Sequence, residues 1–140
     1  MADEPIDPPP AGEGDGLGRA VGIEYLDSSA EVARARVAVS DVIRQPYGIV
    51  HGGAFAVIAE SLCSRATLLV VAADGMICMG QSNQASFLRP ITTGTIHAVA
   101  RSRHRGRSTW IWDTEISDDE GQVCALVRMT IAVRPRPEGR

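Results

Sequence analysis

The 140-residue sequence contains no lysine, so all fourteen of its basic side chains are arginines. This absence excludes a catalytic lysine Schiff base and a phosphate-binding P-loop lysine. Aromatic residues make up only 4% of the chain, and they form no series of rings on which nucleic-acid bases would stack. We therefore expect no nucleic-acid partner.

Cysteine and histidine are also scarce, with three of each. The cysteines are an odd number at wide spacing, which is typical of free thiols in a reducing compartment and not of a disulfide framework: Cys63, Cys78 and Cys124. The histidines lack metal-ligand spacing with each other or with the cysteines, so we expect no metal site. The nucleophile elbow Gly-x-Ser-x-Gly is absent as well.

The first eighteen residues, MADEPIDPPPAGEGDGLG, combine proline, glycine and acids with almost nothing to bury. We predict a disordered tail over residues 1–18, one domain over 19–134 and a C-terminal tail over 135–140. The amino terminus resembles neither a signal peptide nor a transit peptide, so we expect a cytoplasmic protein. Residues 1–16 carry five acids and no base, which more than accounts for the net charge of −3, and the mildly basic remainder suits a small phosphorylated ligand.

The longest apolar stretch covers residues 45–73, QPYGIVHGGAFAVIAESLCSRATLLVVAA. Two turn signals open it. The residues that follow lack glycine and proline for long enough to form a helix of roughly 30 Å. A helix that is apolar on almost every side is enclosed by the protein or lies in a membrane. Because Glu60 and Arg65 interrupt the run, we expect an enclosed helix and no membrane span.

Apolar and polar residues alternate over much of the remaining chain, which is the pattern of half-buried strands. The predicted strands are residues 19–26, 31–39, 78–88, 95–105, 108–116 and 123–133. The predicted fold class is α+β, with a curved antiparallel sheet of about six strands wrapped around one long central helix. Such a sheet covers only part of the helix and has an open strand edge, so we predict a two-fold dimer.

Gly52 and Gly53 stand at the start of the predicted helix, where backbone N–H groups are free and the helix dipole is positive. Glycine leaves these amides open to a ligand oxygen, as in an oxyanion hole. A tight turn before the helix would need the same residues. His51 is equally typical of a helix cap, and Gln45 taken alone is an ordinary loop residue.

Glu60 needs an explanation, because a carboxylate in so apolar a helix should be partly buried, which is costly unless it is paired or functional. One interpretation is a buried ion pair with Arg65 or with an arginine of the sheet. Glu60 lies ~12 Å beyond Gly52 along the helix, too far for both to act on one carbonyl within one chain. In a dimer with antiparallel helices, Glu60 of one subunit would approach the partner's Gly52, so the spacing favours a shared site. Ser64, one turn further on, would hold a water there.

Residues 101–109, RSRHRGRST, form a second cluster with four arginines and a glycine turn that carries hydroxyls. Such a surface binds phosphate through guanidinium groups and turn amides. A solvated strand edge that charge protects from aggregation would have the same composition.

The segment QPYGIVHGGAFAVIAESLCS resembles the helix motif of hotdog-fold acyl-CoA thioesterases. The resemblance is to the branch of 4-hydroxybenzoyl-CoA and 1,4-dihydroxy-2-naphthoyl-CoA thioesterases, which use a helix glutamate. It extends from about residue 18 to residue 133 and includes FLRP at 87–90, the turn at 104–109 and the hairpin at 119–121. Many other hotdog thioesterases have aspartate at the position of Glu60, which supports the glutamate branch.

The resemblance implies a role for each matching residue. Gly52 supplies the N–H that polarises the thioester carbonyl, with Gln45 and His51 beside it. Glu60 from the facing subunit is the nucleophile or the general base for water, and Ser64 helps to place that water. The residues implied to contact the nucleotide end of coenzyme A are Arg89, Ser108 and Thr109, with Arg107 beside them.

The function implied is hydrolysis of an acyl-CoA, with an aromatic or otherwise apolar acyl group, to the free acid and coenzyme A. Coenzyme A is part of the substrate, so no separate cofactor is expected. The active sites would lie at the subunit interfaces of a homodimer or of a homotetramer built as a dimer of dimers. One alternative is a non-catalytic acyl-CoA-binding hotdog protein, which would bind the thioester without releasing thiol. A hotdog hydratase is a further alternative, although its Asp-His signature is absent.

Overall fold

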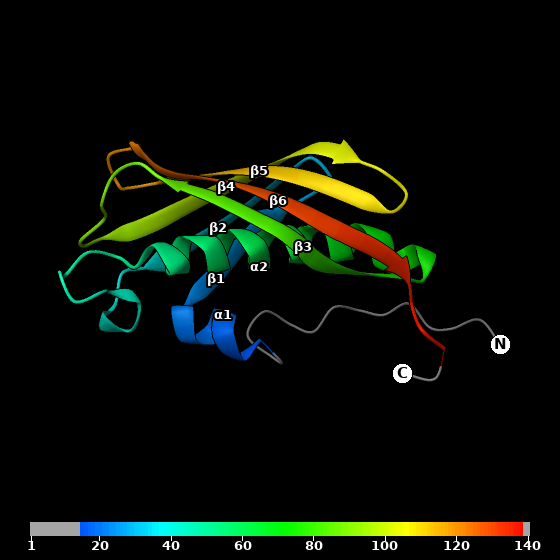
Figure 1. Cartoon of the computed structure of the whole chain (residues 1–140), viewed down its shortest axis with the longest axis horizontal. Helices are drawn as coiled ribbons and strands as arrows, with labels where there is room; N and C mark the ends of the chain where they lie inside the picture. Colours follow the sequence, from blue (N-terminus) through cyan, green and yellow to red (C-terminus); the bar gives the residue numbers. More distant parts are fainter. Residues whose placement is uncertain (1–14, 139–140) are drawn as a thin grey trace.

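The glycine-free run after Gly53 forms the helix around which the fold is built. The computed structural model describes residues 15–138, and in it helix α2, Gly52–Val71, lies along one face of a six-stranded sheet (Figure 1). The helix continues into a short 3₁₀ turn, η2, Ala72–Asp74, and ends at Gly75, whose φ of 70° is the left-handed conformation that glycine adopts without strain. The long central helix predicted from the sequence is confirmed.

The sheet is antiparallel throughout, with the strand order β1-β2-β4-β5-β6-β3. Its strands are β1 Ile23–Ser28, β2 Val32–Ala38, β3 Met76–Phe87, β4 Thr95–Arg105, β5 Thr109–Ser117 and β6 Val123–Pro135. A second 3₁₀ turn, η1, Asp41–Ile43, lies between β2 and α2. The prediction of six strands around one helix is therefore correct, and β1 and β3 are the two edges of the sheet.

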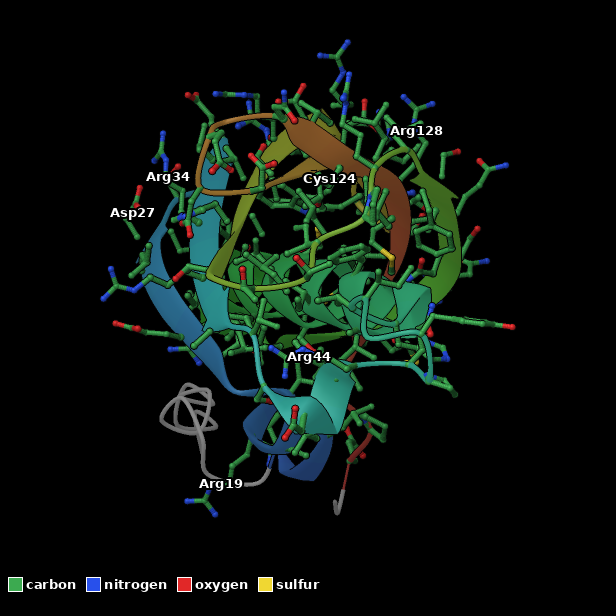
Figure 2. The ribbon with its side chains drawn as sticks, turned by 90° about the vertical axis from the view of Figure 1, so that its left-hand side faces the viewer. Arg19, Asp27, Arg34, Arg44, Cys124 and Arg128 are labelled. Atoms are coloured by element: carbon green, nitrogen blue, oxygen red, sulfur yellow. The ribbon has the colours of Figure 1, made fainter. Side chains whose placement is uncertain are left out.

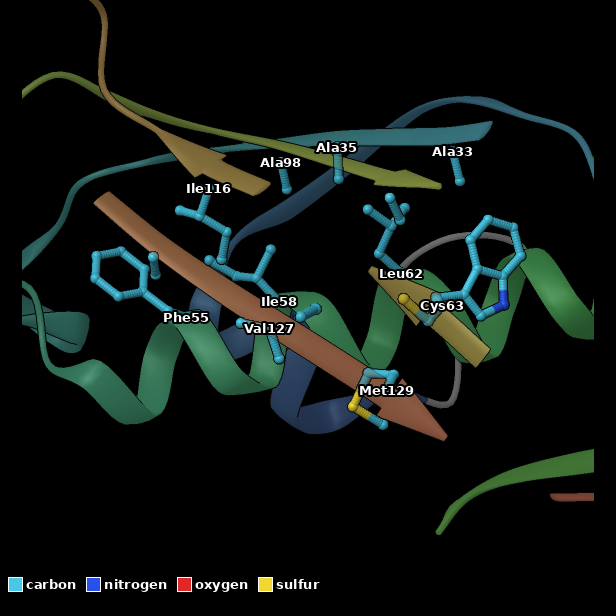
Figure 3. Close-up of a cluster of buried hydrophobic side chains, with 14 of the residues drawn as sticks. Ala33, Ala35, Phe55, Ile58, Leu62, Cys63, Ala98, Ile116, Val127 and Met129 are labelled. Carbon is cyan, nitrogen blue, oxygen red and sulfur yellow. The ribbon is translucent and has the colours of Figure 1, made fainter. Parts of the chain in front are cut away.

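The core lies between α2 and the inner face of the sheet (Figure 3). Small side chains pair across β2 and β4, where Ala33 faces Ala100 and Ala35 faces Ala98. These small side chains are buried and form part of the sheet face that packs against α2. Larger side chains from the helix and from β5 and β6 fill the remaining space: Phe55, Ile58, Leu62, Trp112, Ile116, Val127, Met129 and Ile131.

The outer face of the sheet is charged and ion-paired. Arg128 binds both carboxylate oxygens of Asp113, at 2.7 and 2.9 Å, and Arg34 pairs with Asp27. Viewed toward the N-terminal end of α2, Asp27, Arg34 and Arg128 point away from the helix, and α1 lies below it (Figure 2). The alternation predicted for the strands thus separates a solvated face from a buried one.

The N-terminal end of the domain differs from the sequence prediction. A strand was expected over residues 19–26, but Gly16–Val21 form a helix, α1, and β1 begins only at Ile23. Asp15 caps α1 by accepting a hydrogen bond from the Gly18 N–H at 2.8 Å. Gly22 ends it with a φ of 86°. The predicted tail therefore overlaps α1 at residues 16–18, and residues 1–14 lie outside the described part of the chain.

Edge strand β3 is long, and its side chains are largely exposed. It carries no charged residue and no proline over its twelve residues, although charge and proline are the features that normally prevent an edge from pairing with another strand. Exposed apolar side chains lie on this strand and on the helix, with Met79 of β3 47% and Leu69 of α2 45% exposed. The open edge and partly uncovered helix expected from the sequence are both present.

The segment Gly52–Asp74 is long and apolar enough to cross a membrane by composition, with a mean hydropathy of 1.7. Half of it is buried inside the fold. This burial is typical of the core helix of a globular domain, which meets the same criterion of length and composition.

Candidate active site

The N-terminus of α2 presents one free amide and one capped amide. His51 Nδ1 accepts a hydrogen bond from the Gly53 N–H at 2.8 Å, and the His51 carbonyl accepts one from the Ala54 N–H at 2.9 Å. Within residues 15–138, the Gly52 N–H has no hydrogen-bond acceptor. Gly52 therefore offers the donor that the helix dipole directs toward an incoming oxygen, and His51 acts as the cap.

A pocket of about 460 Å³ opens at this end of the helix. Gln45 forms part of its rim, within a tight turn in which its carbonyl accepts from the Gly48 N–H at 2.9 Å. The Gln45 side-chain oxygen accepts from the Tyr47 N–H. The structure thus brings four of the sequence-predicted site residues into one pocket, together with an apolar wall: Gln45, His51, Gly52 and Arg89, with Ile49, Val50, Phe55, Phe87, Leu88 and Pro90.

Glu60 lies on α2 beside edge strand β3 and is exposed, not buried as the sequence suggested. Asn83 Nδ2 donates to Glu60 Oε1 at 3.3 Å and to the Ala56 carbonyl at 3.0 Å. The alternative of a buried ion pair is not found, because within residues 15–138 Glu60 pairs neither with Arg65 nor with an arginine of the sheet. The Arg65 guanidinium lies over the Tyr25 ring, 4.8 Å from its centroid. The apolar character of the run obscured this, because several of its apolar side chains also lie at the surface.

One chain does not bring Glu60 and Gly52 together. Glu60 lines a separate cleft of about 150 Å³ with Leu17, Val57 and Asn83, whereas Gly52 lines the pocket at the helix end. Their separation of eight positions corresponds to ~12 Å of helix. A carboxylate and an oxyanion donor so far apart cannot act on the same carbonyl without a second copy of the chain.

Ser64 is half-buried one turn beyond Glu60, on the side away from Gly52. Its carbonyl accepts a hydrogen bond from the Cys78 thiol at 3.2 Å, which ties α2 to β3. The cleft that Glu60 lines includes Ser61 and not Ser64, so the water-placing role that the resemblance implies for Ser64 remains a prediction.

The four residues implied to contact the nucleotide lie at opposite ends of the sheet. The N–H groups of Leu88 and Arg89 bond to the Cys124 carbonyl near the start of β6, whereas Thr109 pairs with Ala132 near its end. These points are eight positions apart along β6, or roughly 26 Å. The turn that carries Arg107 and Ser108 is well formed, because Ser108 O accepts from the Val133 N–H at 2.9 Å.

The cysteines are free thiols that burial keeps protonated. Desolvation raises the pKa of Cys63 to about 12 and that of Cys78 to about 11. A thiol must ionise to act as a nucleophile, so neither residue competes with Glu60 for a catalytic role. Cys63 is a core residue, as the sequence suggested.

Sequence reasoning missed the part that Asn83 and Phe87 take in the site. Asn83 contacts Glu60 and Phe87 covers Gly52, yet both belong to a strand separated from α2 by a turn. Neither residue type is unusual in a strand, so the sequence gives no signal for these contacts. They become visible only when β3 is seen packed beside α2. The resemblance included Phe87 in the segment FLRP but did not indicate that its ring contacts Gly52.

Comparisons with known proteins agree with this architecture. A sequence model of the thioesterase superfamily matches residues 47–125. The protein PA1618 of Pseudomonas aeruginosa, named an esterase, is 38% identical over 89% of this chain and 86% of that protein. The proofreading thioesterase EntH of Cronobacter turicensis is 34% identical over 81% of this chain and 82% of that protein.

Solved structures give the same result. The crystal structure of a mutant of the PA1618 thioesterase superimposes with a TM-score of 0.82, covering 86% of each chain at 38% identity. The thioesterase HI1161 of Haemophilus influenzae is 28% identical, with a TM-score of 0.81 over 88% of this chain and 85% of that one.

Proposed function

The chain belongs to the thioesterase superfamily, and on that premise we propose that it hydrolyses an acyl-CoA at sites shared between two subunits. The hotdog fold and thioesterase activity follow from the family. The proposal adds that the thiol is coenzyme A, that Glu60 is catalytic and that two subunits share each site. The observation that carries it is the free Gly52 N–H at a helix N-terminus, with Glu60 exposed two turns away.

The chemistry needs an oxyanion donor and a carboxylate. The Gly52 N–H and the dipole of α2 stabilise the negative charge that develops on the thioester oxygen. Glu60 either attacks the carbonyl carbon itself or removes a proton from the attacking water. The bond from carbon to sulfur then breaks and releases a thiolate. In the general-base route this leaves the free acid directly, and in the nucleophilic route water then hydrolyses the acyl anhydride on Glu60 to give the free acid. Because a thiol has a pKa of about 8.5, this leaving group needs little help from an acid.

The exposed edge of β3 supplies the geometry that one chain lacks. Pairing two β3 strands about a two-fold axis would continue the sheet across both subunits and set the two α2 helices side by side in opposite directions. Glu60 of one subunit would then approach the Gly52 end of the partner's helix. The turn at Arg107–Thr109 would likewise approach the partner's Arg89, which supports a nucleotide site shared in the same way. Two such dimers would form the homotetramer.

The decisive experiment replaces Glu60 by glutamine and follows thiol release from acyl-CoA thioesters. Glu60→Gln removes the base or nucleophile at constant size, so we expect kcat to fall about 10²- to 10⁴-fold. Glu115→Gln is the matched control, because Glu115 is exposed on β5 and outside both pockets. Undiminished turnover by folded Glu60→Gln protein would remove Glu60 from the mechanism. Saturable binding of acyl-CoA without thiol release by the wild type would favour the non-catalytic alternative.

A further inference from the structure

The ring of Phe87, the last residue of β3, lies directly on Gly52 at the start of α2. A Cβ atom added to Gly52 would lie 2.8 Å from both Cε2 and Cζ of Phe87. Real side chains do not approach so closely, because this distance is inside the van der Waals contact of two carbons. The ring therefore occupies the space that any side chain at position 52 would need.

Backbone conformation does not explain the glycine at this position. Positive φ angles occur at Gly22, Gly48, Gly75, Gly94 and Gly121, and Gly52 is not among them. Gly52 is the first residue of a regular helix, where most residue types are tolerated. Because of the close approach of Phe87, a larger residue at position 52 requires the ring to move.

The ring is held on one side and open on the other. Its centroid lies 6.3 Å from that of Phe55, with the ring planes inclined at 42°, which is a favourable aromatic pairing. Phe55 is 3% exposed and anchored in the core, whereas Phe87 is 56% exposed. Phe87 thus extends the core outward as an apolar wall that begins at the free Gly52 amide and lines the pocket.

We propose that Phe87 is a specificity-determining residue, whose ring forms the wall against which the acyl group lies when the thioester oxygen binds the Gly52 N–H. This inference rests on the proposed function. The wall is apolar, with Ile49, Val50 and Leu88 beside it, and it suits a hydrocarbon acyl group. The pantetheine arm carries two amides that would lose their hydrogen bonds to water against such a surface.

The position of the ring selects for shape as well as polarity. A flat acyl group packs on the ring in an offset stack. A group branched at the carbon next to the carbonyl cannot lie flat on the ring, because one of its methyl groups stands out of the plane of the carbonyl. Phe87 therefore favours planar over branched acyl groups.

The test compares kcat/KM for benzoyl-CoA and isobutyryl-CoA in the wild type, Phe87→Leu and Phe87→Ala. We expect the preference for benzoyl-CoA to fall about tenfold in Phe87→Ala and less in Phe87→Leu, as for other changes of pocket shape. Leu126→Ala is the matched control, because it trims an exposed apolar residue on the outer face of the sheet. An unchanged ratio in both Phe87 variants, or an equal loss for both substrates, overturns the proposal.

A double-variant comparison tests the contact itself. Gly52→Ala should shift the ring and reduce benzoyl-CoA turnover in the wild-type background, while the same change should cost several-fold less in Phe87→Ala, where the space is empty. Equal costs in the two backgrounds would show that the ring is not what excludes a side chain at position 52. Gel filtration and circular dichroism check that each variant keeps its assembly and fold.

Failure of this inference is distinguishable from failure of the proposed function. If the wild type releases no thiol from either substrate, the function fails, and binding of the thioether S-benzyl-CoA by calorimetry becomes the readout. An approximately tenfold weaker Kd in Phe87→Ala would then support the contact, and an unchanged Kd would overturn it. If Glu60→Gln abolishes hydrolysis while Phe87→Ala leaves the acyl preference intact, the function stands and the role of Phe87 falls.

Discussion

Asn83 and Glu60 are joined across the junction of strand β3 and helix α2. Asn83 Nδ2 lies 3.3 Å from Glu60 Oε1, and the same amide donates to the Ala56 carbonyl one turn earlier on the helix, at 3.0 Å. The second contact fixes the amide, so the first can orient the carboxylate. Because β3 is the free edge of the sheet, the orientation of Glu60 is linked to the surface that the proposed dimer uses.

We expect Asn83→Ala to lower kcat by about tenfold, which corresponds to the loss of one hydrogen bond to a charged group. KM should change less, since Asn83 lies outside the pocket that contains Gly52. Steady-state kinetics on acyl-CoA measure both quantities. Gln84→Ala, the adjacent change on the opposite face of β3, is the control. A kcat equal to that of the wild type would show that Glu60 needs no such support.

Two variants separate the effect of the Gly52 N–H on catalysis from the effect of the missing side chain. Gly52→Ala and Gly52→Pro both add a Cβ, but only proline removes the N–H. Proline is well tolerated at the first position of a helix, and His51 has the extended conformation (φ −63°, ψ 130°) that a residue before proline adopts. We expect kcat of the proline variant to be about 10²- to 10³-fold below that of the alanine variant. Equal values would assign oxyanion binding to another donor.

Much of the fold was predictable because binary patterning is strong in this chain. The alternation in β2, β4 and β6 and the unbroken apolar run of α2 each specify one type of element. The error at residues 19–26 arose because that segment is apolar in both interpretations. The Asp15 cap and the left-handed Gly22 select the helix. In the sequence, this capping signal is weaker than the signal of the apolar residues, which favoured a strand.

The candidate site was predictable only in part. Gln45, His51 and Gly52 are close in sequence, so a single turn brings them together. Arg89 lines the same pocket only because β3 pairs with β6. Glu60 does not reach this pocket within one chain. Residue type and helical spacing indicate that Glu60 is unusual, whereas its exposure depends on where the sheet ends, which no local pattern encodes.

The buried thiols predict how stability depends on pH. Burial raises the pKa of Cys63 to about 12 from its ordinary value of 9.0. Above pH 9 the thiol ionises in the unfolded chain but not in the folded one, so the unfolded state binds fewer protons and stability falls as pH rises. We expect a slope of about 1.4 kcal/mol per pH unit from this thiol between pH 9 and 12. Urea unfolding at several pH values measures it, and Cys63→Ala should reduce the slope. An unchanged slope would contradict the assignment.

A hydrogen-bond chain in the core connects β5 to α2. Trp112 Nε1–H donates to Thr67 Oγ1 at 2.9 Å, and the Thr67 hydroxyl donates to the Cys63 carbonyl at 2.8 Å. Thr67→Val keeps the volume but leaves the buried indole N–H without an acceptor, which should cost about 1 to 3 kcal/mol of unfolding free energy. In a Trp112→Phe background the donor is absent, so Thr67→Val should cost less. Denaturant unfolding of the four proteins measures the coupling, and additive costs would refute it.

Complementation between two inactive variants tests whether the site is shared. Glu60→Gln and Gly52→Pro subunits, when mixed at equal concentration after unfolding or by co-expression, should form hybrids in which one site has both defects and the other has none. Random pairing makes half of the dimers hybrids, so about a quarter of all sites regain wild-type chemistry. Two affinity tags purify the hybrid, in which about half of the sites should be active. If Glu60 and Gly52 acted within one chain, every site in the hybrid would carry one defect, and the purified hybrid would be as inactive as its parents.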